Sequence, residues 1–291
     1  MTGLDHSETI ILTVECPGRT GLVAVIGTFL SDRGCFIKEM KQFDDLGTGR
    51  FFCRIEFVPG EEKDLQTLSD SFDSIATKFQ MKAKWARQNE PMKTMILVSQ
   101  HDHCLMDLLY RVKKGDLNIE VTKILSNHSV LENIAQFFKV PFEVMPEKAT
   151  KLATKVAREE LMLETKSQTK SELVVLARYM QILSPELCDL WGGECINIHH
   201  SFLPGFKGAR PYYQAFDRGV KQIGATAHYV TSDLDEGPII EQEVARVDHT
   251  FNPEDLTKMG RNMENLALAK AVKMHSEMRV FLNGSRTVVL S

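Results

Sequence analysis

The stretch TMILVSQHDHCLMDLLYRV, residues 94–112, indicates the class of fold that the chain adopts. Its first part, TMILVSQ, is a short apolar run typical of a buried strand. Its second part places Leu105, Leu108, Leu109 and Val112 at helical spacing. A strand that leads directly into a helix is the repeating unit of parallel α/β sheets.

The same alternation continues toward the C-terminus, where short runs rich in valine and isoleucine are separated by stretches of helical periodicity. These runs are IEVTKILSN, FEVMP, ELVVLAR, CINIH and ATAHYVTS. The sequence NPEDL, with Asn252 as the N-cap and Pro253 in the first turn, predicts the start of a last long helix. We therefore predict a Rossmann-like, mostly parallel α/β domain over residues 94–291. In such sheets ligands bind beyond the carboxyl ends of the strands.

A different order precedes residue 94. Residues 8–85 read as strand, helix, strand, strand, helix, strand, and an apolar stripe on the first helix ends near Gly34. This βαββαβ order is typical of the ferredoxin-like arrangement, with two helices on one face of an antiparallel sheet. We predict a first domain over residues 1–86 and a linker over the polar residues 87–93.

Composition excludes several classes of protein. The 291 residues are 43% hydrophobic and 25% charged, which is ordinary for a soluble protein. There is no apolar run of membrane-spanning length and no secretory leader, so we predict a cytoplasmic protein without a membrane partner. The formal charge of −4 and the lack of a basic block argue against nucleic acid as a partner. The six cysteines are scattered without a CxxC pair, which disfavours disulfides and structural zinc.

The strand ends hold the candidate site. In CINIH, Asn197 and His199 alternate, so they point to the same side of a strand. The run ATAHYVTSDLDEGPII brings His228 and then Asp235 to the end of a later strand. Amide and imidazole donors can stabilise an oxyanion, while a carboxylate can orient the imidazole and take a proton from a nucleophile. This set suits hydrolysis or transfer of an acyl-type group.

Other interpretations of these residues stay open at this point. His199, His200 and His228 could bind a metal, although adjacent histidines on an extended strand do not share one easily and no HExxH is present. Asp235 could simply be a turn residue, since DLDEGP is good turn chemistry. The remaining histidines considered, His101, His103, His128 and His249, are more typical of structural or surface positions.

The run from residue 176 to 242 resembles the 10-formyltetrahydrofolate-using formyltransferase family. The family carries N-x-H followed by S-L/F-L-P and a later H-x-V-T-x-x-x-D-x-G-P-I, and this chain has NIHHSFLP and HYVTSDLDEGPI. The resemblance implies that Asn197, His199 and Asp235 are catalytic and that His228 supports them. It also implies a folate cleft lined by two stretches, largely through backbone groups. Their residues are Met180, Gln181, Ile182, Leu183, Val230 and Thr231.

The branches of this family differ in their second substrate, which is the molecule that accepts the formyl group. Family members that use glycinamide ribonucleotide hold its phosphate in a glycine-rich loop after their first strand, and no glycine lies between Val98 and Arg111 here. Members that formylate methionyl-tRNA need a further C-terminal domain for which this chain has no room. Water is then the expected acceptor, and the whole chain resembles the deformylase branch, which releases tetrahydrofolate and formate. Gln181 and the doubled histidine that includes His200 fit this branch.

The resemblance to this branch also implies a role in one-carbon and purine metabolism, with folate as substrate and no cofactor or metal. The main alternative is a transferase that moves the formyl group to an amine such as a purine precursor. A sensor that binds ligand without releasing formate is disfavoured by the intact Asn197, His199 and Asp235.

The first domain resembles an ACT module. The run CPGRTGLVAVIGTFL, residues 16–30, matches the strand, turn and helix in which ACT domains bind small amino acids. The resemblance implies an amino-acid effector near Arg19, Thr20, Gly21 and Leu22, with Gly21 approaching the ligand closely. The alternative is that this domain mainly mediates dimerisation. Exposed sheet edges and the ACT resemblance predict a homo-oligomer.

Overall fold

The computed structural model describes residues 8–205 and 211–291, and the chain folds into two compact units. Unit 1 comprises Met1–Pro91 together with Glu277–Ser291, and unit 2 comprises Met92–Ser276. The predicted boundaries, 1–86, 87–93 and 94–291, need correction in two places. A strand already begins at Met92 within the expected linker, and the last fifteen residues return to unit 1 instead of completing unit 2.

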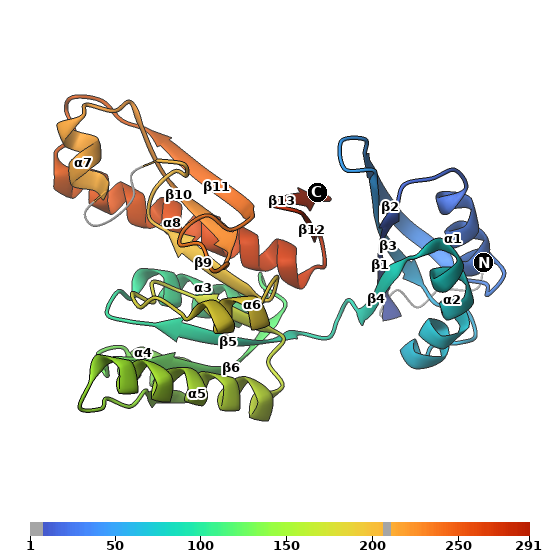
Figure 1. Ribbon diagram of the computed structural model, residues 1–291, viewed down its shortest axis with the longest axis horizontal. Helices are drawn as coiled ribbons and strands as arrows, with labels where there is room; N and C mark the ends of the chain where they lie inside the picture. The colour runs from blue at the N-terminus through green and yellow to red at the C-terminus, as the bar shows by residue number, and fades with distance from the viewer. Residues whose placement is uncertain (1–7, 206–210) are drawn as a thin grey trace. The chain divides into compact units, whose positions relative to one another are not determined.

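Unit 1 is built on the predicted βαββαβ order, with a hairpin added from the C-terminus. Its elements are β1 (Ile10–Pro17), α1 (Leu22–Ser31), β2 (Phe36–Asp45), β3 (Arg50–Val58), α2 (Leu65–Phe79), β4 (Lys82–Arg87), β12 (Val280–Asn283) and β13 (Arg286–Val289). The four-stranded sheet has the order β2-β3-β1-β4 and every neighbouring pair is antiparallel. Both helices lie on the same side of this sheet (Figure 1).

Alternation along the strands of unit 1 divides buried side chains between the two faces of its sheet. On one face, Leu12 of β1 and Ile55 of β3 pack with Ile26 of α1. On the other, Phe52 packs with Phe281 and Leu290 from the C-terminal segment. The C-terminal hairpin therefore covers apolar surface that the helices leave open, which is why these residues belong to unit 1.

Unit 2 has the predicted alternation of strands and helices. Its elements are β5 (Met92–Val98), α3 (His103–Lys114), β6 (Ile119–Ser126), α4 (Glu132–Phe138), β7 (Phe142–Val144), α5 (Lys151–Thr169), β8 (Leu173–Leu176), α6 (Pro185–Leu190), β9 (Cys195–His199), α7 (Pro211–Asp217), β10 (Gln222–Tyr229), β11 (Ile239–Arg246) and α8 (Pro253–Ser276). The seven-stranded sheet has the order β11-β10-β9-β8-β5-β6-β7. The strands from β9 to β7 are parallel and β10 and β11 are antiparallel, so the prediction of a mostly parallel sheet is confirmed.

Helices cover both faces of the unit 2 sheet. Met162 of α5 and Leu187 of α6 pack with strand residues such as Leu97 on one face. Helix α8 contacts α3 and runs along β9, β10 and β11 (Figure 1). As predicted, Asn252 caps α8, because its Oδ1 accepts the N–H groups of Glu254 at 2.9 Å and Asp255 at 3.0 Å. Among the described residues, no helix is both long and apolar enough to cross a membrane.

Candidate active site

Strands β9 and β10 bring three polar side chains together at the site. Asn197 and His199 occupy alternate positions of β9, as the period of two predicts, and His228 lies directly opposite Asn197 on β10. The amide Nδ2 of Asn197 is 3.2 Å from Nε2 of His228. Two residues that are 31 positions apart in the sequence thus form one hydrogen-bonded pair.

The hydrogen bonds of His228 fix its protonation. Its Nδ1 donates to the carbonyl of Tyr229 at 2.9 Å, so in the neutral ring Nε2 is left to accept the bond from Asn197. Burial lowers the pKa of His228 below the ordinary value of 6.5. A neutral His228 therefore orients the amide of Asn197 at physiological pH.

Asp235 reaches the two histidines from the loop between β10 and β11. Its Oδ1 lies 3.1 Å from Nδ1 of His199 and 3.9 Å from Nε2 of His228. The hydrogen bond from His199 lowers the pKa of Asp235, which therefore stays ionised. Asp235 has a backbone φ of 58°, a left-handed conformation that few non-glycine residues adopt.

Gly237 explains how the Asp235 loop comes so close to β10. A Cβ atom at this position would lie only 1.7 Å from the carbonyl oxygen of Tyr229 and 3.2 Å from Nδ1 of His228. The backbone N–H of Tyr229 also donates to the carbonyl of Pro238 at 2.9 Å. Only glycine allows this approach, which holds Asp235 over the histidines.

His199 is the side chain on which these interactions converge. It is 5% exposed, and its Nε2 is buried without a hydrogen-bond partner in the described part of the chain. Because Nδ1 faces Asp235, Nε2 is the nitrogen left for a reacting group. An unsatisfied buried nitrogen is costly in a folded protein, so its retention is typical of a functional position.

The segment that follows His199 is held from the neighbouring strand. Thr226, opposite His199 on β10, donates from Oγ1 to the carbonyl of Ser201 at 2.9 Å and accepts the N–H of Leu203 at 3.1 Å. Gln242 on β11 donates to the carbonyl of Leu203 at 2.9 Å. These hydrogen bonds from Thr226 of β10 and Gln242 of β11 hold the segment that follows β9 in place.

The two stretches expected to line a folate cleft differ in exposure. Met180, Gln181 and Ile182 are exposed, whereas the side chain of Leu183 belongs to the core of unit 2. Ser99 Oγ accepts the N–H of Met180 at 2.9 Å, which fixes the backbone of this stretch at the end of β5.

The second of these stretches starts at the end of β10. Val230 packs against the same core cluster as Leu183, and its N–H donates to the carbonyl of Cys195 at 2.9 Å. Thr231 is partly exposed and donates from Oγ1 to the carbonyl of Asp233 at 3.1 Å. The first stretch offers exposed side chains, while Val230 and Thr231 fix the start of the Asp235 loop.

A second polar cluster lies in unit 2, and sequence reasoning missed it. Glu264 of α8 is 2% exposed; it pairs with Nε2 of His103 at 2.8 Å, accepts the Tyr212 hydroxyl at 2.8 Å and lies 3.4 Å from Nε of Arg178. Burial opposes ionisation of Glu264, but the bond from His103 and the charge of Arg178 outweigh it and lower its pKa. The sequence signal that could have revealed this cluster is Glu264, a glutamate on the apolar side of the long helix α8.

Cys104 also lies near this cluster. The ligand atoms of His103, Cys104 and Glu264 lie within 4.8 Å of one another. Burial raises the pKa of the Cys104 thiol far above its ordinary value, and Arg178 already neutralises the carboxylate. These groups fit a buried ion pair better than a metal site.

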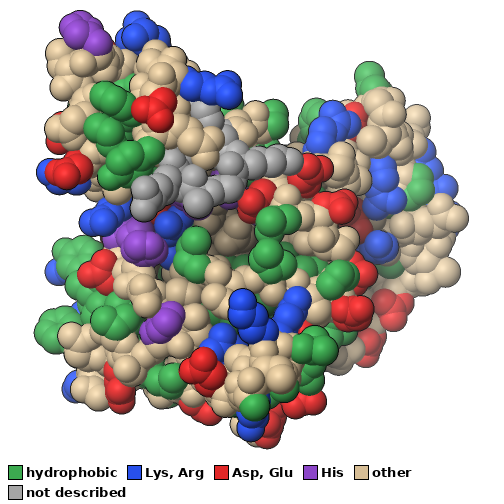
Figure 2. Space-filling view, turned by 60° about the vertical axis from the view of Figure 1, so that its left-hand side comes forward, with side chains coloured by type: hydrophobic (Ala, Val, Ile, Leu, Met, Phe, Trp, Pro, Cys, Tyr) green, Lys and Arg blue, Asp and Glu red, His purple; other side chains and the backbone are tan. Residues whose placement is uncertain are grey.

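His200 lies beside His199 and near the charges of Arg178 and Glu264. Its ring centroid is 5.1 Å from that of His199, and burial together with the charge of Arg178 lowers its pKa to about 4. His200 is therefore neutral at physiological pH. Histidine side chains lie beside lysine and arginine side chains on the left of the face drawn in Figure 2.

Comparison with known proteins places the chain in a family. Residues 92–272 match the family model described as formyl transferase. Formyltetrahydrofolate deformylase of Corynebacterium sp. (strain P-1) is 48% identical over 96% of this chain and 97% of that protein. The corresponding protein of Escherichia coli (strain K12) is 39% identical over 96% of this chain and 98% of its own. This chain belongs to the formyltetrahydrofolate deformylase family.

Solved structures agree with membership of the deformylase family. The crystal structure of formyltetrahydrofolate deformylase from Burkholderia mallei ATCC 23344 is 46% identical, with a TM-score of 0.93 over 98% of this chain and 100% of that one. A glycinamide ribonucleotide transformylase from Symbiobacterium toebii is 27% identical, with a TM-score of 0.64 over 70% of this chain and 97% of its own. The deformylase thus matches nearly the whole chain, whereas the transformylase matches only part of it.

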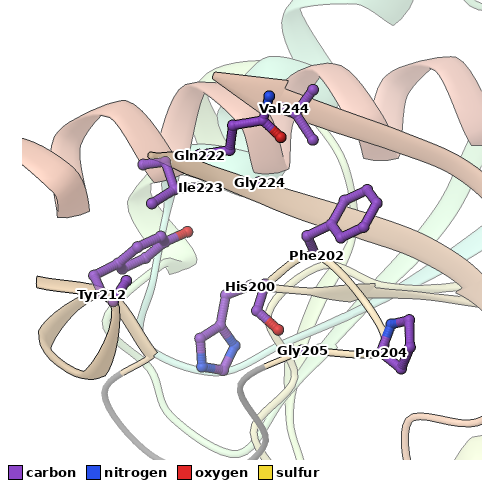
Figure 3. Close-up of a pocket in the computed structure, with 11 residues that line it drawn as sticks. His200, Phe202, Pro204, Gly205, Tyr212, Gln222, Ile223, Gly224 and Val244 are labelled. Carbon is purple, nitrogen blue, oxygen red and sulfur yellow. The ribbon is translucent and has the colours of Figure 1, made fainter. Parts of the chain in front are cut away.

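In this member of the deformylase family, a pocket of about 220 Å³ lies beside the candidate site. His200, Phe202 and Tyr212 line it, and Gly224 of β10 forms part of its wall (Figure 3). Of the site residues predicted from sequence, only His200 is among the described residues that line it.

The predicted effector residues of this deformylase-family member lie at the start of α1. Gly21 has a φ of 91°, and a Cβ atom added to it would meet nothing within 4 Å, so its backbone conformation alone accounts for glycine here. Arg19 donates to the carbonyl of Lys78 at 2.7 Å and stacks over Phe79. Thr20 is exposed and Leu22 is buried in the core of unit 1.

Proposed function

We propose that this chain is an enzyme that hydrolyses 10-formyltetrahydrofolate to tetrahydrofolate and formate, with water as the acceptor. Family membership over nearly the full chain supports the substrate and the reaction. The observation that carries the chemistry is the pair of buried His199 and partly buried Asp235 beside an oriented Asn197 amide.

In the proposed mechanism, the formyl carbon lies between Asn197 and His199 while a water molecule attacks it. The His199–Asp235 pair accepts a proton from the water as its oxygen bonds to carbon. The Asn197 amide and the protonated His199 stabilise the resulting oxyanion. As the C–N bond breaks, His199 returns the proton to N10, and tetrahydrofolate and formic acid leave, the latter ionising to formate.

His228 acts on Asn197 in this proposal. A neutral ring with Nδ1 bound to the Tyr229 carbonyl offers only an acceptor at Nε2. It therefore holds the donor side of the Asn197 amide in one orientation. The side chains named here supply every proton transfer, and the folate enters as a substrate, so we propose that the reaction requires no resident cofactor or metal.

The experiment that tests this function measures tetrahydrofolate and formate released from 10-formyltetrahydrofolate without an amine acceptor. Asp235→Asn and His199→Ala should each lower kcat by about 10²-fold or more, since general acid–base help contributes roughly 10²–10⁴-fold. His249→Gln, at an exposed histidine, is the matched control and should retain the wild-type rate. Near-normal turnover of either site variant would refute the assignment of roles.

The alternative is transfer of the formyl group to an amine such as a purine precursor. It predicts strong stimulation by glycinamide ribonucleotide and little turnover without it. The family comparison favours hydrolysis, because the deformylase structure matches 98% of the chain and the transformylase structure only 70%. Formate released by hydrolysis would supply one-carbon reactions, including those of purine biosynthesis.

We further propose that unit 1 is an ACT-type regulatory domain that binds a small amino acid near residues 19–22, and that the protein is a homo-oligomer. The β2-β3-β1-β4 strand order and the two helices on one side support the domain type. Strands β2 and β4 are edges of this sheet, which supports association. Calorimetric titration with individual amino acids tests the first proposal and sedimentation tests the second.

A further inference from the structure

The C-terminal end of α8 holds the end of β10. Nδ1 of His275 is 2.7 Å from the hydroxyl of Tyr229, and the two ring centroids are 5.7 Å apart at 68°. Tyr229 is 3% exposed, and burial raises the pKa of its phenol. The phenol therefore keeps its proton, and its hydroxyl donates to Nδ1 of His275 in the tautomer that carries the ring proton on Nε2.

Tyr229 is also the residue whose backbone organises the reaction centre. Its carbonyl accepts Nδ1–H of His228 at 2.9 Å, and its N–H donates to the carbonyl of Pro238 at 2.9 Å. Gly237 passes close to the same carbonyl of Tyr229. A shift of Tyr229 would therefore move both His228 and the loop that carries Asp235.

The chain passes into unit 1 two residues after His275. The chain leaves unit 2 at Ser276, and the next residue, Glu277, accepts Nε–H of Arg54 through its carbonyl at 2.8 Å. The Arg54 side chain is 4% exposed on the unit 1 sheet and pairs with Glu56 at 2.8 Å. His275 thus lies two residues from a backbone group anchored in unit 1.

The C-terminal hairpin strengthens this anchor. Phe281 of β12 packs on Phe52 of β3 with ring centroids 5.5 Å apart, and Val288 of β13 packs against the same cluster. Asn283 donates to Asp45 of β2 at 2.6 Å. The residues that directly follow α8 are therefore fixed to the unit 1 sheet by Arg54 and by this hairpin.

We propose that His275, acting through Tyr229, is a positioning residue for His228 and Asp235, and that it transmits displacement of the unit 1 hairpin to the reaction centre. The proposal rests on the proposed function, because it concerns the same reaction. Neither residue touches the reacting atoms, and the chain that directly follows His275 connects them to unit 1.

The first test compares variants of the hydrogen bond itself. Tyr229→Phe removes only the hydroxyl, and His275→Leu removes the acceptor. Each should lower kcat about 3- to 10-fold with little change in KM for the folate, as expected for loss of one hydrogen bond that orients the site. The double variant should be no slower than the slower single one, since both remove the same bond.

His275→Asn separates positioning from packing. The Oδ1 of asparagine takes nearly the place of Nδ1, so this variant should recover most of the rate lost in His275→Leu. Equal kcat in Tyr229→Phe and the wild type would overturn the proposal, and so would additive losses in the double variant. Formate release by the wild type tests the proposed function separately, whereas these ratios test positioning alone.

The second test addresses transmission from unit 1. Phe281→Ala should lower kcat in the wild-type background but have no further effect in the Tyr229→Phe background. Val288→Ala is the milder version should Phe281→Ala fail to fold. Ile75→Val, on the helix side of the unit 1 sheet, is the control and should leave kcat unchanged. Equal losses from the hairpin variants in both backgrounds, or no loss in either, would overturn the proposed route.

Discussion

Replacing Gly237 by alanine tests how the Asp235 loop is held. The added Cβ would lie 1.7 Å from the Tyr229 carbonyl oxygen, whereas such contacts are normally 3.4 Å or longer, so the loop must retreat by roughly 1.7 Å. Asp235 is two residues away, and its 3.1 Å contact with His199 would open well beyond hydrogen-bond range. A misplacement of about 1 Å in an active site can cost about 10²-fold in rate. We expect kcat of Gly237→Ala to fall about 100-fold.

The assay measures formate release at a saturating concentration of 10-formyltetrahydrofolate, and thermal unfolding is measured on the same samples. Gly27→Ala is the matched control, because a Cβ there meets nothing within 4 Å and the position lies within α1. It should raise the free energy of unfolding by about 0.5–1 kcal/mol and leave the rate unchanged. If Gly237→Ala hydrolysed 10-formyltetrahydrofolate nearly as fast as the wild type, the close approach of Gly237 would not be what places Asp235.

Two further predictions concern stability. His228 and His200 have folded-state pKa values below the ordinary 6.5, that of His200 about 4. The unfolded chain therefore binds protons first as the pH falls, so their contribution to stability is complete above about pH 6.5 and is lost as the pH falls toward the folded-state values. The slope is up to about 1.4 kcal/mol per pH unit for each histidine. Urea unfolding at neutral and mildly acidic pH should show this loss, and His200→Asn should reduce it; equal slopes would contradict the stated cause. Separately, Glu264→Gln leaves the Arg178 charge buried without its carboxylate and should cost about 3–5 kcal/mol by urea unfolding. Glu147→Gln, at an exposed position, should change stability by less than about 0.5 kcal/mol, and a similarly small effect at Glu264 would show that its ion pair contributes little.

Local periodicity predicted much of the fold. The period of two in CINIH placed Asn197 and His199 on one side of a strand, and the alternation after residue 94 predicted a mostly parallel sheet. The cap at Asn252 followed from side-chain chemistry that acts over three residues. These features depend on neighbours in the sequence, which is why they can be read from it.

Features that depend on long-range contacts were harder to predict. The Glu264 cluster joins α3, α7, α8 and the end of β8, and no short spacing in the sequence marks it. The return of residues 277–291 to unit 1 depends on an exposed apolar face that Phe281 and Leu290 cover. The placement of Asp235 involves its left-handed backbone and the close approach of Gly237 to another strand, so the sequence predicted the residue but not its placement.

Incorporation of oxygen from solvent distinguishes hydrolysis, in which water is the nucleophile, from transfer of the formyl group. The protein is incubated with 10-formyltetrahydrofolate in water enriched in oxygen-18, with no amine acceptor, and the formate is analysed by mass spectrometry. Hydrolysis predicts one solvent oxygen in each formate, with formate formed in equal amount with tetrahydrofolate and strongly reduced in Asp235→Asn. Tetrahydrofolate that appears only when glycinamide ribonucleotide is added, without labelled formate, would instead identify a transferase.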